Sequence, residues 1–139
     1  MAPHPHLKPA TVLIVENEAL VRLELADWLS KSGIAVFAAT NADEAIVLLD
    51  AHPGIEILLT NIKMPGSMDG VRLSHHVRHR WPPVQIIVMS GLVNTRLSDL
   101  PPGSLFLSKP YAREALREAL AHMISSGPRS AGPPAKLIA

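Results

Sequence analysis

The side chains of this sequence that could do chemistry come directly after its apolar runs. They combine an acidic cluster, an amide, a hydroxyl and a lysine, and together such groups can hold a phosphoryl group and a hard cation. A single serine or lysine in such a place is more often a cap or a solvated side chain, so the signal lies in the combination. The residues are Glu16, Asn17, Glu18, Asn61, Ser90 and Lys109.

Asn61 is the centre of this set. It ends the apolar run Ile57–Thr60 and precedes the turn Met64-Pro65-Gly66, which places it at the carboxyl end of a buried strand. In an open parallel α/β sheet, ligands bind beyond the carboxyl ends of the strands. Asn61 therefore lies where a reactive carboxylate would be expected, but its side chain is an amide.

Five apolar runs alternate with stretches of helical periodicity. This alternation predicts a doubly wound α/β domain, in which a five-stranded parallel sheet lies between two layers of helices. Asn41, three residues before Glu44, and Asp69, directly before Gly70, are typical helix N-caps. The predicted strands are residues 12–15, 34–39, 55–60, 84–89 and 104–107, and the long helices lie near residues 21–32, 42–51, 71–80 and 112–124.

The composition excludes several classes of protein. The chain has 139 residues, 47% of them hydrophobic and 18% charged, which fits one globular domain with a full core. Its formal net charge of +1 gives no electrostatic reason to expect nucleic acid or membrane as a partner. It has no cysteine, so disulfides and thiolate metal sites are excluded. Without a signal-peptide core or a membrane-length apolar run, the expected location is the cytoplasm.

The two ends of the chain differ in composition from its middle. Residues 1–9 are rich in Pro and His, and residues 126–139 are rich in Gly, Pro and Ser. We expect both segments to be flexible. A single domain over residues 10–125 remains.

Five motifs, in this order, closely resemble the receiver domain of bacterial two-component response regulators. The resemblance covers residues 10–125 and implies the CheY-like, flavodoxin-like fold with strand order 2-1-3-4-5. It also implies a cis peptide bond before Pro110. The motifs that carry it are Val12–Glu18, Leu59–Gly66, Met68–Gly70, Met89–Gly91 and Phe106–Pro110.

In that family, a sensor histidine kinase passes a phosphoryl group to an aspartate at the end of the third strand. The resemblance thus implies a sensor histidine kinase, a phosphotransfer protein or a downstream output protein as partner, and Mg²⁺ as cofactor. By position, the phosphoacceptor is Asn61, the metal ligands are Glu16, Asn17 and the backbone carbonyl of Lys63, the switch residues are Ser90 and Phe106, and the phosphate-pairing residue is Lys109.

The sequence departs from the family pattern at Asn17 and Asn61. Asn61 cannot act as the nucleophile, because an amide nitrogen shares its lone pair with the carbonyl and the amide has no anionic oxygen. With carboxylates at both positions the pocket would carry a charge of about −2, but here it carries about zero, which removes several kcal/mol of attraction for a divalent cation. We therefore expect weak or absent Mg²⁺ binding, with the amides hydrogen-bonded to each other, to Glu16 or to Lys109.

Three interpretations of the function remain open. The leading one is a non-enzymatic, single-domain pseudo-receiver that works through protein contacts without phosphorylation, with Ser90 and Phe106 retaining some ability to switch. The second is an ordinary phosphate-accepting regulator into which Asn17 and Asn61 were introduced. The third is a small phosphohydrolase in the same crevice, which would need a carboxylate nucleophile or an assembled metal site, and neither is evident.

The segment between the fourth and fifth predicted strands is short. It contains Pro101 and Pro102, which leave room for a fourth helix of at most about two turns over Thr95–Leu100. Receivers commonly form homodimers through the face of the fourth helix, fifth strand and fifth helix. A shortened fourth helix puts such a dimer in doubt.

Overall fold

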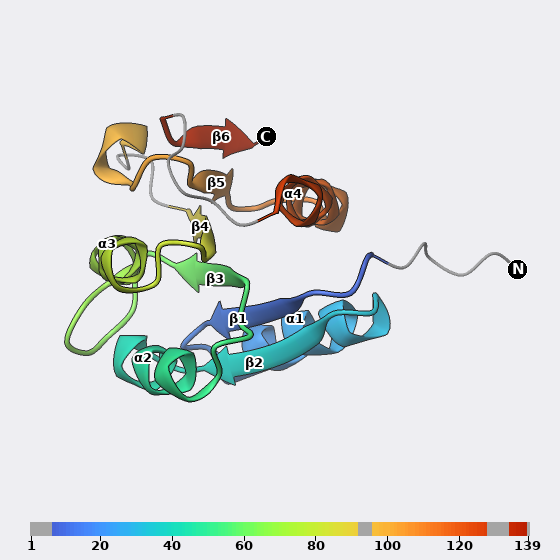
Figure 1. Ribbon diagram of the computed structural model, residues 1–139, viewed down its shortest axis with the longest axis horizontal. Helices are drawn as coiled ribbons and strands as arrows, with labels where there is room; N and C mark the ends of the chain where they lie inside the picture. Colours follow the sequence, from blue (N-terminus) through green and yellow to red (C-terminus); the bar gives the residue numbers. More distant parts are fainter. Residues whose placement is uncertain (1–6, 92–95, 128–133, 139) are drawn as a thin grey trace, which may run out of the picture.

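The structure is a computed structural model that describes residues 7–91, 96–127 and 134–138. The chain forms one sheet with helices on both faces (Figure 1). No helix in these ranges is long and apolar enough to cross a bilayer. The strands are β1 (Thr11–Val15), β2 (Ala35–Ala39), β3 (Ile57–Asn61), β4 (Gln85–Ser90), β5 (Leu105–Ser108) and β6 (Lys136–Ile138). The helices are α1 (Ala19–Lys31), α2 (Ala42–Ala51), α3 (Gly70–Arg80), α4 (Arg113–Ser126) and the short 3₁₀ helix η1 (Leu97–Asp99).

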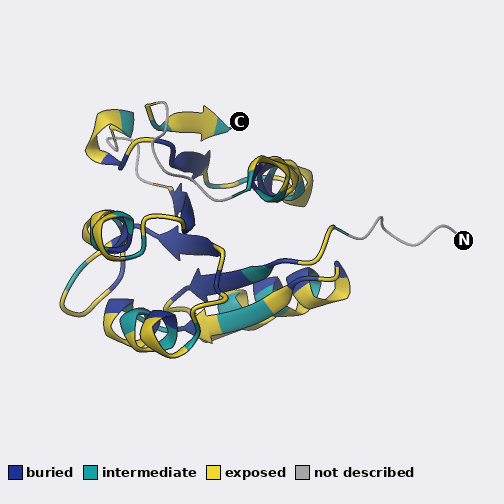
Figure 2. Ribbon diagram, in the orientation of Figure 1, coloured by how far each residue is buried: buried dark blue, intermediate teal, exposed yellow. Residues whose placement is uncertain are grey.

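The sheet is parallel and has the order β2-β1-β3-β4-β5-β6. Strands β1, β3 and β4 are buried along almost their whole length, have apolar central residues and lie in the centre of the sheet (Figure 2). Such strands need cover on both faces, which the flanking helices provide. In the ladder, Thr60 pairs with Val15 of β1 and with Val88 of β4. The polar residues that follow these strands therefore meet at one edge of the sheet.

Each face of the sheet has its own hydrophobic core. Helices α2 and α3 cover one face, where Ala45 and Leu73 pack with Leu58 of β3. Helices α1 and α4 cover the other face, where Leu29 and Leu120 belong to the same buried cluster. The three-layer α/β architecture predicted from the sequence is confirmed.

The predicted helix caps at Asn41 and Asp69 are confirmed. Asn41 Oδ1 accepts a hydrogen bond from the Glu44 N–H, and Asp69 Oδ1 accepts one from the Arg72 N–H, both at 2.9 Å. Glu44 in turn accepts from the N–H of Thr40, one residue before the cap, and this bond lowers the pKa of Glu44. Each cap satisfies a backbone donor that the helix leaves unpaired.

The prediction of a five-stranded sheet is wrong, because β6 pairs with β5 as a sixth strand; the order of the other five is as predicted. The strand lies in residues 126–139, which the sequence analysis assigns to a flexible tail. Its physical reason is the edge of β5, whose backbone groups would be unpaired without a neighbour. Residues 1–6, 128–133 and 139 of the two predicted flexible ends lie outside the described residues.

The segment between β4 and β5 contains only the 3₁₀ turn η1 among its described residues. The predicted helix over Thr95–Leu100 is thus reduced to Leu97–Asp99, and Thr95 itself lies outside the described residues. His75 Nε2 on α3 lies 2.6 Å from the carbonyl oxygen of Asp99. This hydrogen bond fastens η1 to α3.

Gly70 joins α3 to the end of β3. Its N–H donates to the carbonyl oxygen of Ile62 at 2.7 Å. A Cβ atom at this position would lie 1.8 Å from the carbonyl oxygen of Asn61, which is an impossible contact with backbone. Only glycine lets the helix approach the strand this closely, and the approach helps to fix the place of Asn61.

We predict that Gly70→Ala lowers the free energy of unfolding by about 3 kcal/mol, because the clash forces α3 away from β3. Gly54→Ala is the matched control, since a Cβ at Gly54 meets no atom within 4 Å. Its effect should stay within about 1 kcal/mol. Urea unfolding of both variants measures the difference, and equal stabilities would contradict this account of Gly70.

Candidate functional site

An open cleft of 590 Å³ lies beyond the carboxyl ends of the central strands. Its walls come from the loop after β1, the end of β3 and its following turn, the end of β4, and the residue after β5. Glu16 is not among the residues that line it, and the sequence-predicted site residues that do are Asn17, Glu18, Asn61, Lys63, Ser90 and Lys109. The structure therefore brings together residues that lie far apart in the sequence.

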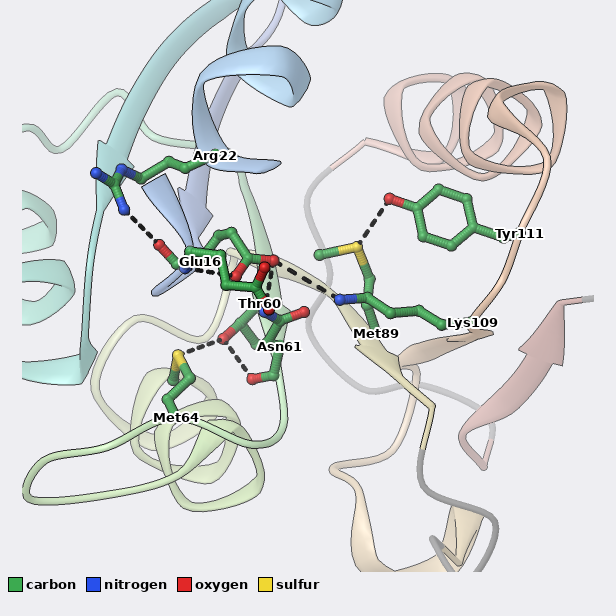
Figure 3. A network of polar contacts seen from close by, with 9 residues as sticks. Glu16, Arg22, Thr60, Asn61, Met64, Met89, Lys109 and Tyr111 are labelled. Carbon is green, nitrogen blue, oxygen red and sulfur yellow. Dashed lines mark hydrogen bonds and ion pairs between the residues drawn. The ribbon is translucent and has the colours of Figure 1, made fainter. Parts of the chain in front are cut away.

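Glu16 is the buried anion of the site, with only 1% of its surface exposed. Its Oε1 accepts a hydrogen bond from Asn61 Nδ2 at 2.6 Å and lies 3.6 Å from Lys109 Nζ (Figure 3). Its Oε2 accepts from the backbone N–H of Glu18 at 2.9 Å. Both carboxylate oxygens thus have partners from the protein itself, and these partners offset the cost of burying the charge.

Asn61 turns its donor toward this carboxylate. Thr60 Oγ1 donates to the backbone carbonyl of Asn61 at 2.9 Å, which holds the end of β3 in place. Asn61 Oδ1 is buried and has no hydrogen-bond partner among the described residues. The side chain therefore acts as a donor to Glu16, where an aspartate would present a second anion.

Two predicted switch residues occupy different surroundings. Ser90 ends β4 and lines the cleft. Phe106 lies on β5 within the buried cluster that contains Val88 and Leu100. Phe106 is not among the residues that line the cleft. The Lys109–Pro110 peptide bond, which follows β5, is cis.

Two residues that contact the site were missed by the sequence analysis. Arg22 Nη1, from the first turns of α1, donates to the backbone carbonyl of Glu16 at 2.9 Å. The Tyr111 hydroxyl donates to Met89 Sδ at 3.4 Å (Figure 3), and Met89 lines the cleft. Arg22 follows Glu16 by six residues with no motif to mark it, whereas Tyr111 directly follows Lys109-Pro110 and could have been considered.

The residues of the cleft do not fit Mg²⁺, which prefers several oxygen ligands in an octahedral arrangement. Among the residues that the structure describes, Glu16 is the only buried carboxylate, and both of its oxygens already have protein partners. Asn61 points an NH₂ group toward Glu16 and so occupies one of the carboxylate oxygens that a cation would need. Across the described ranges, no group of three or more His, Asp or Glu side chains could hold a metal ion.

Comparison with known families decides the identity of the fold. The sequence model of the response regulator receiver domain matches residues 12–121. This chain belongs to that family. Receiver domains are generally non-enzymatic signalling modules of two-component systems, and they interact with histidine kinases and with phosphotransfer or output proteins.

The relatives of this receiver are larger proteins. It is 31% identical over 125 residues to the response regulator protein FleR of Pseudomonas aeruginosa. This match covers 87% of this chain and 26% of FleR. It is 30% identical over 119 residues to the sensor kinase CckA of Brucella abortus, covering 83% of this chain and 12% of CckA. The chain thus spans about a quarter or less of the length of these two relatives.

Solved receiver structures share its fold. The receiver protein from Sinorhizobium medicae superposes with a TM-score of 0.78 at 25% identity, covering 86% of this chain and 97% of that one. The receiver domain of the hybrid histidine kinase CckA gives a TM-score of 0.71 at 27% identity, covering 83% and 99%. These likenesses place the receiver in the CheY-like fold.

Tyr111 reports on the electrostatics of this receiver's cleft. Burial raises the pKa of the Tyr111 hydroxyl above its ordinary value, and the Glu16 carboxylate raises it further, while Arg113 opposes them. A raised pKa in the folded state means that folding favours the protonated phenol. This contribution to stability is complete below about pH 10, the pKa of an unfolded tyrosine, and is lost as the pH rises through the native pKa.

Tyr111 is the only tyrosine, so ultraviolet absorbance of the phenolate follows it alone. We predict a titration midpoint above about pH 10 in the native protein and near 10 in concentrated urea. Glu16→Gln should lower the native midpoint without abolishing the shift, because burial is the larger cause. Equal native and unfolded midpoints would show that the phenol is not held in this environment.

Proposed function

We propose that this receiver is a pseudo-receiver, which works by binding other proteins without phosphorylation at Asn61. The observation that carries the proposal is the hydrogen bond from Asn61 Nδ2 to Glu16 Oε1. In this bond the side-chain nitrogen of Asn61 donates to Glu16, at the position where the family uses a carboxylate nucleophile. The nitrogen lone pair of such a group is delocalised into the carbonyl, and the amide has no anionic oxygen with which to attack phosphorus.

The proposal includes weak or absent binding of Mg²⁺. One carboxylate, Glu16, faces one ammonium group, Lys109, at 3.6 Å. A second cation would have to compete with this lysine and with the Asn61 amide for the same oxygen. The charges of the pocket already balance without an ion.

The partners we propose are proteins of the same signalling system: a histidine kinase, a phosphotransfer protein or an output protein. Leu20 and Leu23 on α1 are 69% and 64% exposed, and α1 begins directly after Glu18 at the rim of the cleft. Exposed apolar side chains beside a site favour a protein partner. The formal net charge of +1 gives no comparable support for nucleic acid.

The experiment is incubation with acetyl phosphate and Mg²⁺, followed by intact mass measurement. The native chain is compared with Asn61→Asp and with Asn17→Asp/Asn61→Asp. We predict that only the double variant gains a phosphoryl mass in high yield, because it regains both the attacking carboxylate and a second metal ligand. The Asn61→Asp variant should react more slowly.

Peptide mapping of the native chain provides the control. It checks that Asn61 has not deamidated to aspartate, which would add an acceptor without any substitution. A phosphoryl group on a native chain with intact Asn61 would refute the proposal. If no variant is phosphorylated, the pocket has lost more than two carboxylates, and its resemblance to an active receiver site is only geometric.

A further inference from the structure

Strand β6 lies outside the part of the chain that matches the receiver family. The match ends at residue 121, whereas β6 spans Lys136–Ile138 and extends the sheet beyond β5 (Figure 1). The strand is thus an addition of this chain to the family domain. It covers the edge where the receiver sheet would otherwise end.

Residues 134–138, which we call the strap, are held by backbone pairing and by two small apolar contacts. The Lys136 N–H donates to the carbonyl oxygen of Ser104 at 2.9 Å, and Lys136 pairs with Leu105 in parallel register. Ala135 packs against the core under α2 and α3. Ile138 packs against the core under α1 and α4.

The strap is seated loosely compared with the rest of the sheet. Pockets of 380 and 390 Å³ that are open to solvent lie along it, the first against Leu97 and Leu100, the second against Ser104 and Met123. The strap therefore has solvent-open space beside it, where a strand in the centre of the sheet has closely packed side chains. Ser104 Oγ is buried without a hydrogen-bond partner among the described residues, and Leu137 is 50% exposed. A three-residue ladder therefore carries most of the attachment.

We propose that the edge of β5 is a strand-docking site and that the strap occupies it in cis. The ligand class of the site is an extended apolar peptide that runs parallel to β5 and presents small and branched side chains to the two cores. A partner's segment of this kind would have to displace the strap, because both would use the same backbone groups. The inference does not depend on the state of Asn61.

The alternation of a parallel strand supplies a matched pair of variants. Successive residues point their backbone N–H groups to opposite sides. Since the Lys136 N–H points to Ser104, the Leu137 N–H points away from β5. Lys136→Pro removes the ladder donor, whereas Leu137→Pro removes an outward donor and should spare the pairing.

The test adds a synthetic peptide with the sequence of residues 133–139 to the ¹⁵N-labelled full chain at about 1 mM, the range of a tethered strand's effective concentration. We expect shifts of the amide resonances of Leu105–Leu107 in Lys136→Pro. Native protein and Leu137→Pro should show an apparent affinity at least tenfold weaker. Unshifted β5 resonances in Lys136→Pro, or equal shifts in native protein, would overturn the proposal.

A second pair guards against a folding defect in the proline variants. Ile138→Asp places a charge against the core under α1 and α4, and Leu137→Asp places one on a half-exposed side chain. Only Ile138→Asp should admit the peptide. Dispersed resonances of β1 and β3 confirm that each variant is folded. Equal peptide binding in both aspartate variants would contradict the proposal that the strap occupies the edge of β5.

Discussion

The hydrogen bond between Asn61 and Glu16 joins the ends of β3 and β1, and the cleft depends on it. A buried carboxylate must find donors or cations within the protein, because it has left water. Glu16 finds an amide from the end of β3, an ammonium group after β5 and a backbone N–H in its own loop. Parallel pairing of β1 with β3 places Val15 beside Thr60 and so brings Glu16 next to Asn61, which means that this contact follows from the topology.

The amide of Asn61 offers Glu16 a hydrogen-bond donor, where a carboxylate would present a second negative charge. A carboxylate beside Glu16 would repel it and would favour a cation between the two. The amide donates instead, and one lysine completes the neutralisation. The receiver thus keeps the cleft, the hydroxyl of Ser90 and the cis Lys109–Pro110 bond. The negative charge of Glu16 is balanced by Lys109. This combination supports the proposal that the receiver works as a binding module.

Sequence patterns predicted the parts of this molecule that local chemistry dictates. Apolar runs set the central strands, the caps at Asn41 and Asp69 set two helix starts, and strand ends placed Asn61 and Lys109 at one edge. The contacts of Arg22 and Tyr111 depend on how elements pack, and only Tyr111, directly after Lys109-Pro110, has a sequence position that could have suggested a place near the site. Strand β6 was missed because three residues after a Gly- and Pro-rich stretch have no periodicity, and only the open edge of β5 gives them a place.

The most direct test of this account compares the free energy of unfolding of native protein and of Asn17→Asp/Asn61→Asp with and without Mg²⁺. Loss of the charged hydrogen bond should make the variant about 1.5–3 kcal/mol less stable without the ion. Millimolar Mg²⁺ should restore much of that loss in the variant and leave native protein unchanged. If native protein gains as much stability from Mg²⁺ as the variant does, the amide has not taken the place of a cation and the account is wrong.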